Sequence, residues 1–181
     1  MQKFRLDIER EKALVAWLAL ATGIEVMCDK QDAHDGVTNT KRPDLPYVLL
    51  NIISGPRKIG EADKTWKEDD TWDYKRHKEI TVSVNVYANN NHLGLMEIIQ
   101  DSLDHDTVLI EFRSAGLAFL NATNPSDIST LLDTKTEFRV TMDIIFGYAK
   151  TTQDEPGEIR TVEMDHDYNE GDHVGTKIIG V

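Results

Sequence analysis

The sequence lacks the features that mark secreted and membrane proteins. Its single cysteine, Cys28, makes an intrachain disulfide impossible, which weakly favours a reducing compartment. Charged residues interrupt the first dozen positions, so we expect no signal peptide. The longest apolar stretches are far too short to cross a bilayer, and we expect no membrane association.

Positive charge is also scarce. The 181 residues include 20 Lys and Arg against 32 Asp and Glu, which gives a formal net charge of -12. Proteins that grip nucleic acid by its phosphates need clustered Lys and Arg, so the composition argues against that class. It remains compatible with a surface past which DNA slides without sticking.

Catalytic and metal-binding motifs are missing as well. Gly55 and Gly60 lack the Lys and Ser/Thr of a phosphate-binding loop, and Cys28 has no local nucleophile signature. Asp104-His105-Asp106 and Asp165-His166-Asp167 contain suitable ligand types, but adjacent side chains diverge instead of converging on one ion. We interpret the first group as a helix cap, with either Asp104 or Asp106 as the capping residue. We predict no catalytic residue, no metal and no cofactor.

Two segments show the alternation of half-buried strands. From Glu137 to Tyr148 the even positions are apolar and nearly all odd positions are polar, and Glu79–Ala88 follows the same pattern. Two long strands with one apolar face each should pair and cover one core. We expect further strands at Ile24–Cys28, on an edge, and at Tyr47–Ile53, which is apolar on both faces.

Helical periodicity covers the remaining core. Ile8–Thr22 is predicted as an amphipathic helix capped by Asp7 and closed by Gly23. A second helix follows Asn91, and a shorter third helix ends at Gly116. We expect an apolar anchor before the last long strand. The residues expected to face inward are Leu95, Ile98, Ile99 and Leu103 in the second helix, Val108, Leu109 and Phe112 in the third, and Ile128, Leu131 and Leu132 in the anchor. The predicted class is α+β, with a mostly antiparallel sheet and helices packed on one face.

Residues 55–78 are too long and too rich in aromatics for an idle loop. We predict a projecting hairpin arm whose Trp66, Trp72 and Tyr74, with Arg57 and Lys58, contact a partner. The alternative is that the two tryptophans fold back on the parent domain.

A change in composition follows residue 150. We predict a core domain at residues 1–150 and a linker that begins at Thr151. Residues 151–181 are then an acidic C-terminal extension that serves as an assembly arm. Its apolar end is formed by Ile178, Ile179 and Val181.

The order of these elements resembles the neck and tail-terminator proteins of contractile and long-tailed phages. The resemblance covers about Leu6 to Lys150. It rests on Arg42-Pro43, Pro46-Tyr47, Ile53-Ser54-Gly55-Pro56, the Val82–Tyr87 strand and Thr136-Glu137-Phe138-Arg139.

The resemblance implies a non-enzymatic virion protein. Such proteins form rings, typically hexamers, that cap the tail tube, stop its polymerisation and offer a joining surface to the head. The implied partners are other copies of the chain, the tail tube protein and a head-completion or connector protein, with the sheath as a further candidate. DNA would pass through the lumen without specific binding. The implied location is the virion neck, with assembly in the host cytoplasm.

Three other functions stay open at this stage. The chain could be a head-completion or head–tail connector protein of the same neck. It could be an acidic, non-enzymatic binding module that docks a basic partner as a monomer or dimer. It could also be a metal-dependent hydrolase that uses the groups around Asp104 and Asp165, which would require metal-dependent activity.

Overall fold

The computed structural model describes residues 8–28, 43–68, 71–132, 135–155, 161–162 and 179–180. Its contacts divide the chain into two units. The first unit comprises Met1–Ala62 and Lys75–Lys150, and the second comprises Asp63–Tyr74 and Thr151–Val181. No helix in the described ranges is long and apolar enough to cross a membrane.

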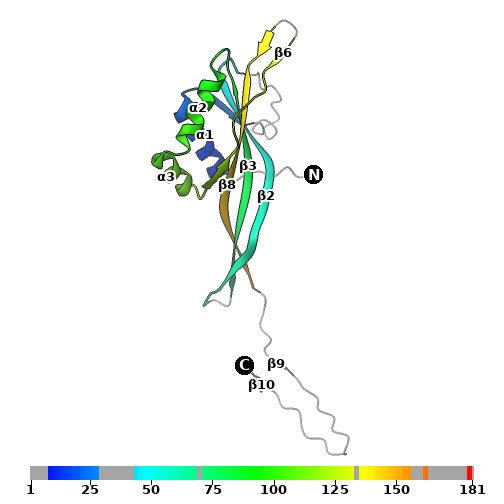
Figure 1. Ribbon diagram of the computed structural model, residues 1–181. Helices are drawn as coiled ribbons and strands as arrows, with labels where there is room; N and C mark the ends of the chain where they lie inside the picture. The colour runs from blue at the N-terminus through cyan, green and yellow to red at the C-terminus, as the bar shows by residue number, and fades with distance from the viewer. Residues whose placement is uncertain are drawn as a thin grey trace, which may run out of the picture. The chain divides into compact units, whose positions relative to one another are not determined.

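The main sheet has the strand order β1-β2-β3-β8-β4, with β5 beside β8. Its long central strands β2, β3 and β8 lie side by side (Figure 1). Its strands are β1 (Glu25–Cys28), β2 (Tyr47–Trp66), β3 (Trp72–Tyr87), β8 (Arg139–Asp154), β4 (Ala118–Ala122) and β5 (Ser126–Asp127). The edge strand β1 runs parallel to β2, whereas β4 and β5 both run antiparallel to β8. The predicted α+β class with a mostly antiparallel sheet is therefore confirmed, as is the pairing of the two alternating strands, β3 and β8.

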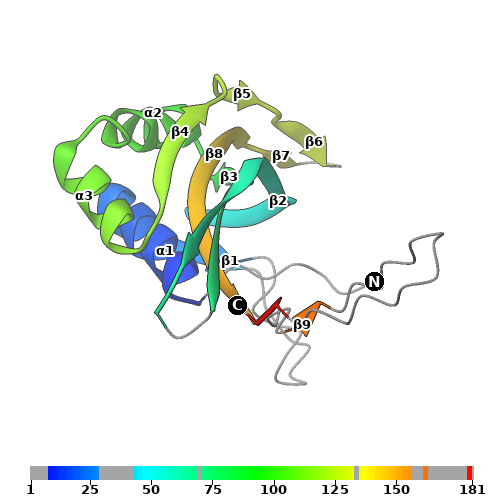
Figure 2. The ribbon, with the colours of Figure 1, turned by 90° about the horizontal axis from the view of Figure 1, so that it is seen from below.

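Three helices lie along one face of this sheet (Figure 2). They are α1 (Ile8–Thr22), α2 (His92–Ser102) and α3 (Asp106–Ser114). Gly23 and Gly116 have φ values of 69°, in the left-handed region that glycine adopts without strain, so α1 and α3 end where the sequence predicted. The N-cap of α3 is His105, so the assignment of a cap to Asp104 or Asp106 was wrong. Asp106 is instead the first helical residue, where its negative charge interacts favourably with the positive end of the helix dipole.

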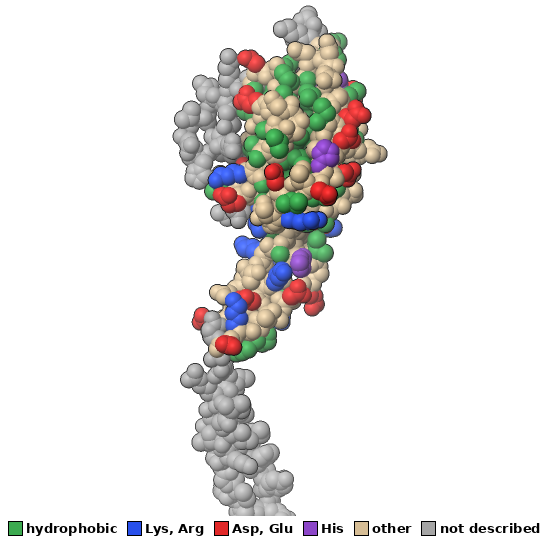
Figure 3. All heavy atoms as spheres, turned by 90° about the vertical axis from the view of Figure 1, so that its left-hand side faces the viewer, with side chains coloured by type: hydrophobic (Ala, Val, Ile, Leu, Met, Phe, Trp, Pro, Cys, Tyr) green, Lys and Arg blue, Asp and Glu red, His purple; other side chains and the backbone are tan. Residues whose placement is uncertain are grey.

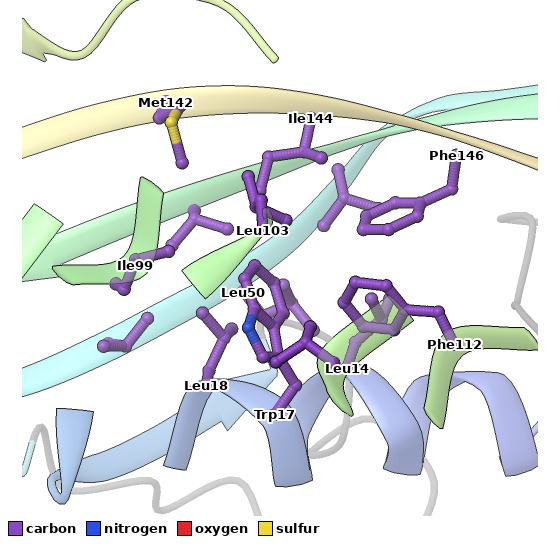
Figure 4. Close-up of a cluster of buried hydrophobic side chains, with 14 of the residues drawn as sticks. Leu14, Trp17, Leu18, Leu50, Ile99, Leu103, Phe112, Met142, Ile144 and Phe146 are labelled. Carbon is purple, nitrogen blue, oxygen red and sulfur yellow. The ribbon is translucent and has the colours of Figure 1, made fainter. Parts of the chain in front are cut away.

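The core lies between the helices and the sheet (Figure 4). The Phe112 ring meets both Trp17 and Phe146 edge to face, with each pair of ring centroids 5.1 Å apart. The Trp17 Nε1–H donates to Ser102 Oγ over 2.9 Å, so the indole is buried with its polar atom paired. Most even-numbered residues of the two alternating segments are buried as predicted, while Phe138 is half-buried and the odd-numbered Ser83, Asn85 and Tyr87 are buried as well. The buried even-numbered residues are Ile80, Val82, Val84, Val86, Ala88, Val140, Met142, Ile144, Phe146 and Tyr148.

Several residues predicted to be inward-facing are exposed. In α2 the buried apolar residues are Met96 and Ile99, so Ile98 lies off that face and is 47% exposed. The anchor before β8 is instead a small hairpin of β6 (Thr130–Leu132) and β7 (Lys135–Glu137). Leu131 on this hairpin is 74% exposed because the two short strands pair only with each other, and Ile128 is also exposed.

Three strands extend beyond their predicted ends, and β2 continues past Ile53 to Trp66. β3 begins at Trp72, and β8 continues to Asp154, through the residues predicted to start a linker. In the second unit, β9 (Thr161–Val162) pairs antiparallel with β10 (Ile179–Gly180), with Ile179 opposite Val162.

Candidate assembly surfaces

The first candidate surface is the tip of the β2–β3 hairpin. Trp66 near the end of β2 and Trp72 at the start of β3 meet edge to face, with ring centroids 5.0 Å apart. The Lys67 N–H donates to the Thr71 carbonyl over 2.9 Å, and the Lys67 ammonium lies 2.9 Å from the Asp73 carboxylate. The two tryptophans therefore support each other across the turn, and Trp66 still leaves 45% of its surface exposed.

The other predicted arm residues have different surroundings. The Lys64 ammonium lies over the Tyr74 ring, 5.6 Å from its centroid, so this half-buried ring also contacts its own hairpin. Arg57 forms an ion pair with Glu79 on the adjacent strand, and Lys58 is exposed. Exposed ion pairs contribute little to stability. The main effect of the Arg57–Glu79 pair is that each charge neutralises the other, so neither is fully available to a partner.

The second candidate, an internal cluster and not a surface, contains Tyr47, Tyr87 and Arg139, three of the residues that carried the family resemblance. Tyr47 is buried and stacks on Tyr87, with ring centroids 4.7 Å apart and an interplanar angle of 13°. The Arg139 guanidinium lies 5.2 Å from the Tyr87 ring centroid and donates to Asn85 Oδ1 over 2.8 and 3.3 Å. This cluster couples β2, β3 and β8, so the tyrosines and Arg139 contact one another inside the domain.

Neither proline of the same motif is fully buried. Pro46 follows a cis peptide bond and is exposed, while Pro43 is half-buried. Arg42 lies outside the described residues. Of the C-terminal arm, Ile179 lies in β10, and Ile178 and Val181 fall outside the described residues.

The third candidate surface is a groove of about 480 Å³ that no sequence pattern had indicated. Its apolar part is formed by Ile59 from β2, Leu117 and Leu120 from around β4, and Tyr148 from β8. Its basic part is formed by His77, Lys78 and Arg113. Figure 3 views the helical face, where hydrophobic side chains gather on the upper part of the first unit and Lys and Arg side chains lie along its lower edge. We call the groove lined by these apolar and basic residues the basic groove.

The basic groove was missed because its residues come from distant parts of the chain. The region from Lys58 to Lys78 holds similar numbers of both charges, which predicts no basic patch. In the structure, Glu79 is paired with Arg57 and Asp73 with Lys67, while Arg113 joins Lys78 from another element, α3. No linear pattern connects β3 with α3, so only the tertiary structure brings these cations together.

The described residues that were considered as metal ligands or as a nucleophile have ordinary surroundings. Within the described ranges, no cluster of three or more His, Cys, Asp or Glu side chains is placed to hold a metal ion, and Asp104, His105 and Asp106 are exposed. Asp165–Asp167 lies outside those ranges. Burial, with the Glu11 carboxylate as a smaller cause, raises the pKa of the Cys28 thiol to about 12. Cys28 therefore stays a neutral thiol at pH 7, which suits a small apolar strand residue.

A polar contact joins α2 to the segment after β4. The Asp127 carboxylate accepts hydrogen bonds from the Ser129 hydroxyl (2.6 Å) and backbone N–H (2.9 Å), and lies 3.3 Å from His92 Nε2. These contacts, the Ser129 hydroxyl first, lower the pKa of Asp127 to about 2. His92 is buried beside Phe138, so the contact holds β5 against the start of α2.

This contact predicts a pH-dependent contribution to stability. The pKa of Asp127 is lower in the folded state than its ordinary value of 3.8, so its stabilising effect is complete above about pH 5 and is lost as the pH falls toward 2. Asp127→Asn should therefore lower the melting temperature near neutral pH and match the parent protein near pH 2. Thermal melts of both proteins across this range would check the prediction, and two parallel curves would contradict it.

Comparison with known families gives one match. The sequence model of a family described as phage neck terminator protein matches residues 11–172. No curated protein matches the chain. The match runs well past Lys150, so limiting the resemblance to Leu6–Lys150 was wrong, and much of the C-terminal extension belongs to the family pattern.

Proposed function

Because the chain belongs to the phage neck terminator family, we propose that it forms a ring, with six copies, that caps the phage tail tube. The family is one of structural neck and tail proteins and not of enzymes, and its members assemble with other tail and neck proteins. The family match is the observation that carries the proposal. In this role the ring ends polymerisation of the tube and offers its other side to a head-completion or connector protein.

The shape of the main sheet supports self-association into a ring. Among the described strands, β1 lies at one edge of the sheet and β4 and β5 lie at the other, so the sheet has two different edges at which another chain can add backbone contacts. A closed ring is built from such head-to-tail contacts, in which one surface of a subunit meets a different surface of the next. We propose that the β2–β3 hairpin tip, with Trp66 and Trp72, supplies an aromatic contact to a neighbour or to the tube.

The charge of the chain suits a channel for DNA. Six chains of -12 each carry -72 in total, and this repels the phosphate backbone from the wall of a lumen. DNA would then pass without specific binding, which is the behaviour a tail channel requires. The same charge makes phosphate-gripping modes of DNA recognition unfavourable.

The ring can be tested by its mass and by its effect on tubes. Gel filtration with light scattering should give about 120 kDa, six times the 20.5 kDa chain, either for the protein alone or after release from tubes. Adding the protein to tail tubes assembled from the same phage's tube protein should stop elongation and place a ring at the tube end in negative-stain images. A monomer or dimer that neither binds tubes nor changes their length would overturn the proposal. A ring that binds only the head side would instead identify a head-completion protein.

A further inference from the structure

We propose that the basic groove binds the acidic C-terminal extension of a second copy of this chain. The proposal rests on the self-association proposed above and names the surface and the segment that produce it. It concerns residues 155–181 as the occupant, and Ile59, Leu120, Tyr148, Lys78 and Arg113 as the principal binding residues.

The apolar part of the groove is open to an occupant. Ile59 is 41% exposed and Leu120 is 50% exposed, although both are large aliphatic side chains. They line the groove beside the buried Leu117 and Tyr148. A groove of about 480 Å³ accommodates a few side chains of an extended segment, and covering Ile59 and Leu120 removes apolar surface from water.

The basic part of the groove favours an anionic occupant. Neither Lys78 nor Arg113 forms an ion pair within the part of the chain that the structure describes. The neighbouring carboxylate of Glu79 is paired with Arg57, so it does not neutralise Lys78. In a chain of net charge -12, this local excess of positive charge selects an acidic partner.

The C-terminal extension has the two properties that an occupant of the groove needs, which are negative charge and apolar side chains. Its only Lys and Arg residues after Asp154 are Arg160 and Lys177, and its apolar end is Ile178, Ile179 and Val181. Its acidic residues after Asp154 are Glu155, Glu158, Glu163, Asp165, Asp167, Glu170 and Asp172. The family match continues through residue 172, so all seven of these carboxylates lie in the segment that the family pattern includes.

A neighbouring copy is the natural source of the occupant. Tyr148 and Ala149 line the groove on β8, and the same strand then continues away along the chain to Asp154. Because β9 pairs with β10, the extension doubles back, and its farthest point from residue 155 lies at most roughly 50 Å away at about 3.3 Å per residue, which is enough to enter an adjacent subunit. If each extension enters the next groove, the contacts are head to tail and close a ring.

The test uses two full-length variants with reversed charges. The groove variant is Lys78→Glu with Arg113→Glu, and the extension variant is Asp165→Lys with Asp167→Lys and Asp172→Lys. Each variant alone should lose self-association by at least about tenfold, because like charges then face each other. An equimolar mixture should recover it, because each groove then meets an extension of opposite charge on the other variant. Light scattering across a concentration series measures both effects.

The matched control is Lys75→Glu with Lys150→Glu. These two exposed residues do not line the groove, and the pair changes the net charge as much as the groove variant does. It should self-associate within about twofold of the parent protein, since exposed charges outside the groove lining contribute little. Circular dichroism establishes folding of every variant, and Lys78→Gln with Arg113→Gln replaces the groove variant if charge reversal prevents folding.

A second readout does not depend on a ring. Fluorescence anisotropy of a labelled peptide of residues 158–181 should report binding to the full-length protein and loss of binding with the groove variant. If the protein stays monomeric but binds the peptide, the proposed binding site in the groove stands and the proposed ring does not. The proposed occupant would be overturned if both variants assembled normally or if their mixture failed to recover self-association. It would also be overturned if the groove variant lost binding to duplex DNA but bound the peptide as the parent protein does.

Discussion

Replacing Trp66 and Trp72 together with alanine should leave the chain folded and weaken ring closure or tube capping by about 30-fold or more. Truncating an interface hot spot typically costs about 2 kcal/mol or more, and 1.4 kcal/mol corresponds to a factor of ten in affinity. Large aromatic side chains contribute most to such contacts because they bury much area with few rotatable bonds.

The surroundings of the two tryptophans explain why folding should survive. Their principal described contact is with each other, at ring centroids 5.0 Å apart, and Trp66 is 45% exposed. Trp17, by contrast, is buried among the core residues and donates to Ser102. The double variant should therefore retain its circular-dichroism spectrum and thermal transition, whereas Trp17→Ala should lose roughly 3–5 kcal/mol of stability.

Two controls separate assembly from folding. Trp66→Phe with Trp72→Phe keeps an aromatic pair at the hairpin tip and should retain most of the assembly. Light scattering and tube-capping assays are compared with thermal melts of the same samples. If the alanine variant fails to fold, the tryptophans belong to a core. If it folds and assembles with unchanged affinity, the interface lies elsewhere, and the exposed edge strand β1 becomes the first place to look.

The second large effect is expected from a charge in the core. Val84→Asp or Ile144→Asp should prevent folding, because each residue is fully buried between the sheet and the helices. A buried carboxylate with no partner costs several kcal/mol, which is comparable to the whole stability of many domains. The two residues lie on the adjacent strands β3 and β8, so both variants test the same packed layer.

Thr151→Asp is a suitable control for this pair. It introduces the same charge on the same strand as Ile144→Asp, but at an exposed position. Its thermal transition should stay within a few degrees of the parent protein, because exposed substitutions usually change stability by less than about 0.5 kcal/mol. Cooperative, soluble folding of Val84→Asp and Ile144→Asp would contradict the assignment of this face to the core.

The sequence by itself determined the elements whose signals are local. Alternation marked β3 and β8 because a strand turns successive side chains to opposite faces, and the buried set runs from Ile80 to Val86 and from Val140 to Tyr148. Gly23 and Gly116 marked two helix ends because a left-handed residue there suits glycine. The order of these elements was enough to indicate the neck terminator family, which the family match then confirmed.

Burial of single residues was decided by the tertiary structure. Ile98, Ile128 and Leu131 are as apolar as the core residues beside them, and sequence pattern placed all three inside. Whether a side chain is covered depends on an element that packs over it, and this element can lie anywhere in the chain. The two-stranded β6–β7 sheet is separate from the main sheet, so Leu131 remains exposed.

The candidate surfaces also differ in whether they could be predicted from the sequence. Trp66 and Trp72 could be singled out from sequence because large aromatics in a long, turn-rich segment need an explanation. The Tyr47–Tyr87–Arg139 cluster and the basic groove could not, because each joins residues from strands and helices far apart along the chain. Charge pairing adds a further reason. A mixed charge composition cannot say which cation is paired, and only the folded arrangement pairs Arg57 with Glu79 while Lys78 and Arg113 meet at the groove.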